Sequence, residues 1–178
     1  EELTKQDIIS EVMEYTKNTI NWTRPPQQIG VVETMEIDGI GELHARFDTG
    51  NAAGSSSLDA QDINVSGSKV TWSTNGKRMS GKKIDDVRMK NNHDADEKID
   101  EKRPVVELDV TFEGVSYKDV PFNLNDRSHK STPILINKDF MIRSGSVVNP
   151  AKVYAVTNKP DYLKKKKKKI DSEEREEN

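Results

Sequence analysis

The spacing of apolar residues changes across Arg24-Pro25-Pro26, and this change limits the fold more than any other feature. Before it, apolar side chains recur at the spacing of one helical face between residues 4 and 20. From residue 30 onward, short runs alternate between apolar and polar residues, which is typical of half-buried strands. Proline clashes with the preceding helical turn and lacks an N–H donor. The sequence therefore predicts an N-terminal helix and connector over residues 1–26, and a β domain over residues 27–158.

The N-terminal segment carries the signals of an amphipathic helix. Thr4 and Asp7 have the spacing of a capping box, in which each side chain accepts a hydrogen bond from the other residue's backbone. The residues at helical spacing behind the cap are Ile8, Ile9, Val12, Met13, Thr16 and Ile20. Such an apolar stripe has to be covered. We expect the helix to pack on its own domain or to bind a partner.

Turn dipeptides divide the β region into hairpins. Gly preceded by Asp or Asn between two strand-like runs is a strong hairpin signal. Two such turns are expected: Asp38-Gly39 between runs 30–37 and 40–47, and Asn75-Gly76 between 69–74 and 77–84. A third hairpin is expected to turn near Glu113-Gly114, between runs 104–112 and 115–124. The fold class indicated is mostly β and antiparallel.

The remaining segments complete this prediction. The apolar run 132–137 indicates a buried strand, 138–144 a short internal helix ended by Gly145, and 146–156 a last strand. The small-residue segment 50–57 and the polar, acidic segment 91–101 are expected to be loops.

Composition narrows the functional classes. Of the 178 residues, 33% are charged and 32% are hydrophobic, so part of the chain is expected to lie outside a packed core. The formal net charge of −3 gives no overall attraction to nucleic acid or to a membrane surface. No apolar run approaches the roughly 18 residues of a membrane span. The absence of cysteine excludes thiolate ligands and cysteine nucleophiles.

The C-terminal tail, residues 159–178, is predicted to be a separate charged segment. The run Lys164–Lys169 could make weak contacts with phosphate or with an acidic surface. An acidic stretch follows it, so the charges of the tail nearly cancel. A solvated tail is therefore the favoured interpretation.

Histidine positions give no support for a metal site. His44, His93 and His129 are far apart in the sequence and have no neighbouring ligands at a spacing typical of metal centres. We therefore predict no metal ion and no cofactor. His44 is expected in a strand, and His129 in a loop.

One tripeptide has a possible catalytic meaning. Asp48-Thr49-Gly50 directly follows a predicted strand, and four further motifs come later in the same order as in a known family: Leu58-Asp59-Ala60, Asp126-Arg127, Pro133 to Lys138, and Val148-Asn149-Pro150. With these motifs, residues 30–155 resemble the retropepsin-like aspartic proteases. The resemblance is closest to the bacterial and phage family of ATP-dependent zinc proteases. It implies a closed or partly closed β-barrel.

The same resemblance implies roles for individual residues. Asp48 would be the catalytic carboxylate, Thr49 would brace it by hydrogen bonds, and Gly50 would permit the tight turn. Because the chain has a single Asp-Thr-Gly, the second carboxylate would come from the other subunit of a homodimer. The Asn75-Gly76 hairpin lies where a substrate flap would be expected, with an ordinary hairpin as the alternative. Asn137 stands where retropepsins have a glycine.

Two functions follow from these features. The first, which the sequence favours, is a structural or assembly protein, such as a phage virion component, that keeps the retropepsin-like fold without needing catalysis. It would contact other subunits of a particle through the helix and the tail, and it would be found in the virion or the host cytoplasm. The alternative is a homodimeric aspartic peptidase that cleaves an extended peptide with one Asp48 from each subunit.

Overall fold

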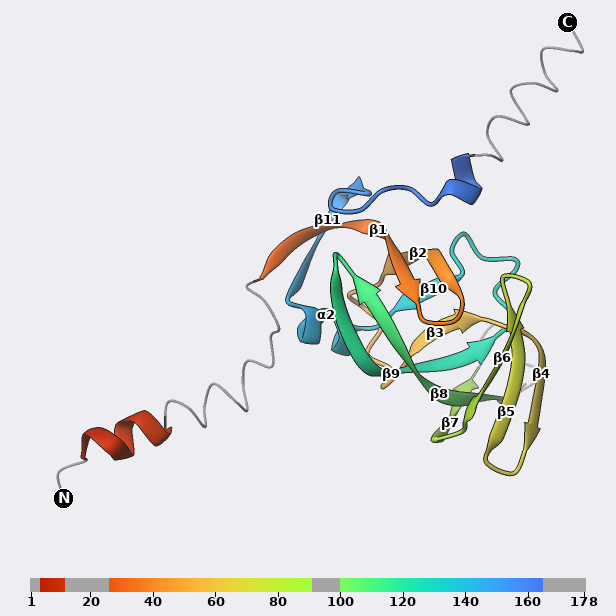
Figure 1. Cartoon of the computed structure of the whole chain (residues 1–178), viewed down its shortest axis with the longest axis horizontal. Helices are drawn as coiled ribbons and strands as arrows, with labels where there is room; N and C mark the ends of the chain where they lie inside the picture. Colours follow the sequence, from red (N-terminus) through yellow and green to blue (C-terminus); the bar gives the residue numbers. More distant parts are fainter. Residues whose placement is uncertain (1–3, 12–25, 91–99, 165–178) are drawn as a thin grey trace, which may run out of the picture.

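A computed structural model of the chain describes residues 4–11, 26–90 and 100–164. Figure 1 shows a strand-rich body with one helix, α2, at its side. The elements of this body are β1 Gln27–Ile37, β2 Gly41–Phe47, β3 Ser56–Asp59, β4 Gln61–Ser66, β5 Lys69–Thr74, β6 Lys77–Lys82, β7 Asp85–Lys90, β8 Asp100–Phe112, β9 Val115–Asn125, β10 Ile134–Ile136, α2 Lys138–Ser144 and β11 Ser146–Val153.

The main sheet curls into a ring. Within the described residues it has eight strands in the order β11-β1-β2-β10-β3-β9-β8-β7. An additional pairing between β1 and β8, at Glu36–Thr111 and Ile37–Val110, joins two strands that are far apart in this order. Strands β1, β2, β10, β3, β9 and β8 therefore form a partly closed barrel, which β11 and β7 extend at the edges. Strands β4, β5 and β6 form a separate three-stranded sheet. This confirms the predicted fold class.

Alternation along the strands fills the barrel. In β2, the side chains of Leu43, Ala45 and Phe47 are buried, while those between them are more exposed. The largest fully buried side chains are Trp72, Tyr117, Phe47, Phe112 and Phe122. Rings of Phe47 and Phe112 lie 5.2 Å apart between centroids, within the range of favourable aromatic packing.

The three predicted hairpins are present. At the β5–β6 turn, Asn75 has φ 51° and Gly76 has φ 72°, as a type I′ turn requires. Glu113 and Gly114 have the same pair of positive φ values between β8 and β9. Gly39, with φ 79°, stands in the β1–β2 turn. The dipeptides that identify these turns are local, so the sequence alone is enough to find them.

Two loop predictions are wrong in part. Ser56 and Ser57 belong to β3 and are buried, although small polar residues rarely favour a strand. The side chain of Asn123 in β9 accounts for this: its amide donates to Ser55 Oγ at 3.0 Å and to Ser56 O at 2.9 Å. Its Oδ1 accepts from Ser57 Oγ at 3.1 Å. Tertiary hydrogen bonds therefore override the local preference.

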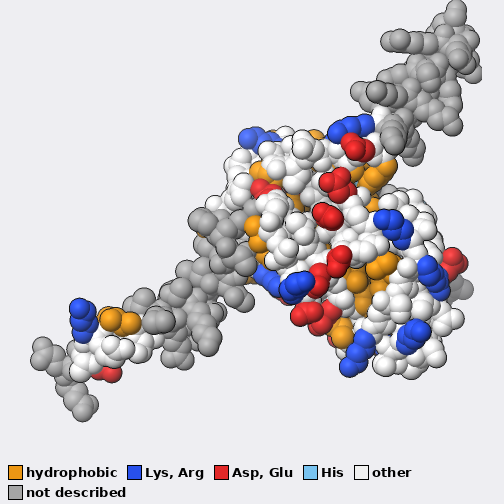
Figure 2. All heavy atoms as spheres, in the orientation of Figure 1, with side chains coloured by type: hydrophobic (Ala, Val, Ile, Leu, Met, Phe, Trp, Pro, Cys, Tyr) orange, Lys and Arg blue, Asp and Glu red, His pale blue; other side chains and the backbone are white. Residues whose placement is uncertain are grey.

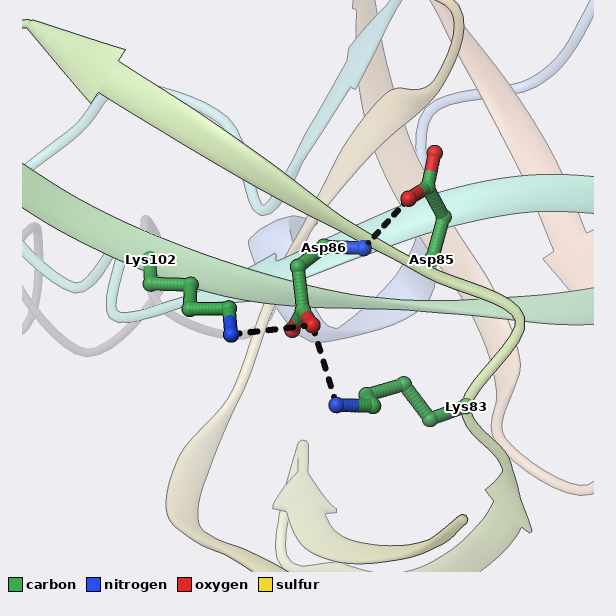
Figure 3. Close-up of polar contacts among 4 residues, drawn as sticks. All are labelled: Lys83, Asp85, Asp86 and Lys102. Carbon is green, nitrogen blue, oxygen red and sulfur yellow. Dashed lines mark hydrogen bonds and ion pairs between the residues drawn. The ribbon is translucent and has the colours of Figure 1, made fainter.

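Other strands were not expected from the sequence. The first residues of β8, Asp100 and Glu101, fall in the predicted loop 91–101, of which 91–99 lie outside the described residues. The strands β4 and β7 were also missed. In β7, the Asp86 carboxylate pairs with Lys83 Nζ at 2.9 Å and Lys102 Nζ at 3.3 Å (Figure 3). These contacts tie the polar edge strand to β8.

The N-terminal helix is confirmed over residues 5–11. Its capping box is formed: Thr4 N donates to Asp7 Oδ2 at 2.9 Å, and Asp7 N donates to Thr4 Oγ1 at 3.2 Å. Hydrogen bonds from Thr4 lower the pKa of Asp7. Ile8 and Ile9 are exposed. The rest of the predicted helix and its proline connector lie outside the described residues.

Charges of both signs are spread over the molecule. On the face shown in Figure 2, acidic side chains form a band across the barrel, and lysine and arginine side chains lie around it. This mixture agrees with the small net charge. None of the described helices is long and apolar enough to cross a membrane.

A buried carboxylate fastens the C-terminal part of the chain to β1. Glu33 is 0% exposed. Its oxygens accept hydrogen bonds from the backbone N–H groups of Gly30, Ala155, Val156 and Thr157 at 3.0 to 3.2 Å, and from Thr157 Oγ1 at 3.0 Å. Residues 154–162, here called the strap, therefore run along the outside of β1 (Figure 1). The folded body includes part of the segment predicted as tail, because Tyr162 also contacts His44.

We predict that Glu33→Gln lowers the free energy of unfolding by about 2–4 kcal/mol, because the new amide turns N–H groups toward buried N–H donors. Urea unfolding measures this change, and hydrogen exchange of the Ala155 and Val156 amides should become faster. The matched control is Glu42→Gln, an exposed carboxylate on β2, for which we expect a change within about 0.5 kcal/mol. Equal effects of the two substitutions would contradict a special role of Glu33.

Candidate functional site

The Asp-Thr-Gly turn leaves the barrel at the end of β2. Asp48 N donates to Ile136 O of β10 at 3.1 Å, which fixes the start of the turn. The Asp48 side chain then accepts from Gly50 N at 3.0 Å through Oδ1. Asp48 is half-buried, and Thr49 and Gly50 are exposed. The carboxylate is thus oriented by its own turn while the tip of the turn remains open to solvent.

Strand order explains why this turn has a defined position. The short strand β10 lies between β2 and β3, parallel to β2 and antiparallel to β3. The segment that joins β2 to β3 contains Asp48, so both of its ends are hydrogen-bonded to the same central strand. The turn is consequently held at one end of the barrel by long-range pairing.

Asn137 fixes the segment between β2 and β3 through buried hydrogen bonds. Its side-chain Nδ2 donates to Ala53 O at 2.7 Å, and its Oδ1 accepts from Ser56 Oγ at 3.1 Å. The same Oδ1 accepts from Phe140 N at 3.1 Å and so caps α2. Asn137 is 2% exposed. The sequence identified it as a departure from the retropepsin glycine, whereas the structure shows a buried side chain that joins the turn to α2.

Backbone contacts complete this arrangement. Lys138 N donates to Asn51 O at 2.9 Å, and Asn51 N donates to Asp48 O at 3.0 Å. Asn51 Oδ1 accepts from Ala53 N at 3.1 Å. Two asparagines therefore organise the residues behind the carboxylate, which sequence reasoning did not foresee.

The other predicted site residues do not gather around Asp48. Lys77 Nζ donates to Ile40 O at 2.8 Å, which places the β5–β6 turn near the start of β2, whereas Asp48 follows its end. Asn75 and Gly76 therefore do not cover the Asp48 of their own chain. Their role as a flap stays a prediction.

Asp126 and Arg127 lie in the loop before β10, beyond the end of β3 that is distant from the turn. Asp126 is exposed and accepts from Ser128 N at 2.9 Å, and its hydrogen bonds with Ser128 lower its pKa. Arg127 is 8% exposed, and its backbone N donates to Asp59 Oδ1 at 2.6 Å. Both residues thus make hydrogen bonds that shape this loop, and neither contacts Asp48.

The histidine predictions are confirmed where they can be compared. His44 is in β2 and His129 is in the loop after β9, whereas His93 lies outside the described residues. Among the described residues, no group of three or more His, Cys, Asp or Glu side chains could hold a metal ion. The zinc implied by the resemblance therefore has no fitting ligand set in this part of the chain.

We predict that Asn137→Ala lowers the free energy of unfolding by about 2–4 kcal/mol, because it removes a helix cap and leaves Ala53 O and Ser56 Oγ without their partner. Chemical denaturation measures the loss. Lys138→Ala is the control, because Lys138 is the next residue in the chain and is exposed. An Asn137→Ala protein as stable as this control would show that the hydrogen bonds of the Asn137 side chain contribute little to stability.

Comparison with known proteins agrees with this geometry. A family model described as RimB-like, retropepsin-like aspartic endopeptidase RimB, matches residues 28–159. Among solved structures, the chain is similar to the crystal structure of Lpg0085, a protein with unknown function (DUF785) from Legionella pneumophila subsp. pneumophila str. Philadelphia 1, with 27% identity and a TM-score of 0.57. The match covers 73% of this chain and 98% of that chain. No curated protein matches the sequence. The family model spans most of the chain, from β1 to the strap, and the chain therefore belongs to the RimB-like family of retropepsin-like aspartic endopeptidases.

Proposed function

We propose that this chain is an aspartic endopeptidase that works as a homodimer, with one Asp48 from each subunit. The observation that carries the proposal is the Asp48 turn, which hydrogen bonds to Ile136 and Asn137 hold in position. Its carboxylate is oriented by Gly50 N, and Thr49 and Gly50 remain exposed, where a second copy of the turn can reach them. Membership in a family of aspartic endopeptidases supports the same reaction class.

The chemistry follows from placing two such carboxylates together. Two neighbouring carboxyl groups cannot both ionise cheaply, so the pair shares one proton. The ionised Asp48 removes a proton from a water molecule, and the resulting oxygen nucleophile attacks the scissile carbonyl. The protonated Asp48 of the other subunit donates to the carbonyl oxygen. Breakdown of the tetrahedral intermediate returns a proton to the leaving amine. No step in this scheme requires a metal ion.

The substrate class is an extended peptide. A peptide lying between two Asp48 turns would have to be straight enough for one carbonyl to face both carboxylates. We keep the Asn75-Gly76 turn as a proposed flap only for the dimer, because within one chain it lies near the opposite end of β2.

The virion or assembly role favoured by the sequence stays a prediction, as does its location in a particle or in the host cytoplasm. The segments that motivated it lie mostly outside the described residues. Lys164, the first residue of the lysine run, pairs with Asp161 at 3.1 Å. This ion pair joins residues three positions apart and does not indicate where a partner would bind. The geometry therefore supports the peptidase function better.

We predict that Asp48→Asn reduces cleavage of an unstructured protein substrate by about 10²–10⁴-fold while thermal unfolding is unchanged, because the amide keeps the shape but cannot share a proton. Peptide products measured by mass spectrometry report the activity. Pepstatin should inhibit the wild-type protein, and a chelator should not. The control Asp62→Asn removes an exposed carboxylate at a position with φ 50°, which Asn also tolerates, and should retain full activity. Wild-type protein without any cleavage would favour the structural alternative.

We also predict that activity depends on both subunits. If each site needs two Asp48 residues, random mixing of equal amounts of wild-type and Asp48→Asn chains leaves about a quarter of the dimers active. Chains that act alone would instead keep about half of the activity. Mixing under conditions that allow subunit exchange, followed by an activity assay, separates these outcomes. A value near one half would remove the shared site.

A further inference from the structure

A pocket lies at the end of β3 that is distant from Asp48. Its volume is about 220 Å³. It is lined by residues from β2, the end of β3, the β5–β6 turn, the loop before β10 and the strap: Leu43, His44, Asp59, Thr74, Asn75, Arg127, Ser128, Lys130, Ser131, Pro133 and Tyr162. The walls therefore come from five segments of one chain, and the pocket needs no second subunit.

Arg127 is the unusual member of this wall. Only 8% of it is exposed, and its Nε donates to Thr132 O at 3.2 Å. Its two terminal nitrogens have no hydrogen-bond partner among the described residues, and neither is sealed from solvent. Burial lowers the pKa of the guanidinium, and the nearby charge of Arg103 lowers it further, while Asp59 raises it. Arg127 lines the pocket, and terminal donors without a protein partner are available to an anion there.

The one carboxylate in the wall is already engaged. Asp59 Oδ1 accepts from Arg127 N at 2.6 Å and from Gln61 Nε2 at 2.8 Å. No ion pair joins the Asp59 carboxylate to the Arg127 guanidinium within the described residues. Lys130 adds a second positive charge at the exposed rim, beside Ser131. The charged groups of the lining thus leave an excess of positive charge.

The part of the wall that His44 and Tyr162 form is uncharged and fixed by hydrogen bonds. His44 Nε2 donates to Ser131 O at 3.0 Å, so its Nδ1 is the acceptor for the Tyr162 hydroxyl. Burial lowers the pKa of His44 and raises the pKa of Tyr162, which favours the neutral form of both. This pair attaches the strap to β2 and closes one side of the pocket. The pocket is consequently formed before any ligand arrives.

We propose that this pocket binds a small oxyanion, a carboxylate or a phosphate group, through the guanidinium of Arg127 with Lys130 at the rim. The planar fork of an arginine matches the two oxygens of such an anion. The volume suits a small anion or the end group of a longer ligand, because sites for drug-sized molecules are larger. The site is separate from Asp48, and it does not depend on the proposed peptidase function.

The test is a titration of the ¹⁵N-labelled full chain with inorganic phosphate and, separately, with acetate, at an ionic strength held constant with potassium chloride. Saturating NMR shifts of the amides of residues 126–132 with either anion support the site, and the anion that binds more tightly identifies its class. We expect Arg127→Lys to weaken binding by about tenfold, because it keeps the charge but loses the fork. Shifts that do not saturate with either anion would overturn the proposal.

Two variants of exposed lysines keep the test decisive if the buried Arg127→Lys substitution prevents folding. Lys130→Glu reverses a charge that lines the pocket and should weaken binding several-fold. Lys82→Glu makes the same charge change on β6, outside the pocket, and should leave binding unchanged. Equal weakening by both variants would show a general effect of net charge and would refute a specific site. The Asp48→Asn protein should bind like the wild type.

Discussion

The buried amide of Asn137 joins β10 and α2 to the segment of Ala53 and Ser56, which is 81 to 84 residues from Asn137 in the sequence, and the candidate site depends on this junction. It contacts Ala53 and Ser56 behind the Asp48 turn, and it caps α2 through Phe140. A buried polar side chain is stabilising only when its donors and acceptors are paired, and here both ends of the amide are used. The turn, the central strand and the helix are therefore fixed together, which is the kind of rigid support that a catalytic geometry needs.

Two carboxylates of the barrel show how burial separates a structural role from a chemical one. Glu33 is fully buried, and its two oxygens accept five hydrogen bonds. It has no capacity left for a substrate or for a second acid. Asp48 is half-buried, and the only described donor to its carboxylate is Gly50 N. One oxygen is thereby oriented and the other is available, so the same functional group fastens the strap at one place and can take part in proton transfer at the other.

Local signals could be predicted from the sequence, and long-range pairing could not. The turn at Asn75-Gly76 and the capping box of Thr4 and Asp7 each depend on residues within a few positions, and both form as expected. The burial of Ser56 and Ser57 depends instead on Asn123, 66 to 68 residues away. The sequence showed only that Asn137 stands in place of a glycine, because its partners Ala53 and Ser56 cannot be identified without the strand order. For the candidate site, the sequence therefore identified the Asp48 motif but not the residues that hold it in position.

The two sites of this chain differ in what completes them. The walls around Arg127 come from one subunit, with the strap held on β2 by His44 and Tyr162. The Asp48 turn is equally well fixed, but a single chain supplies only one carboxylate, so the proposed peptidase chemistry would require a second copy. Subunit dissociation on dilution would therefore remove proton sharing at Asp48 and leave the Arg127 pocket intact. Because the loop with Arg127 leads directly into β10, which also holds the Asp48 turn, the fold connects a complete site to an incomplete one through a single short strand.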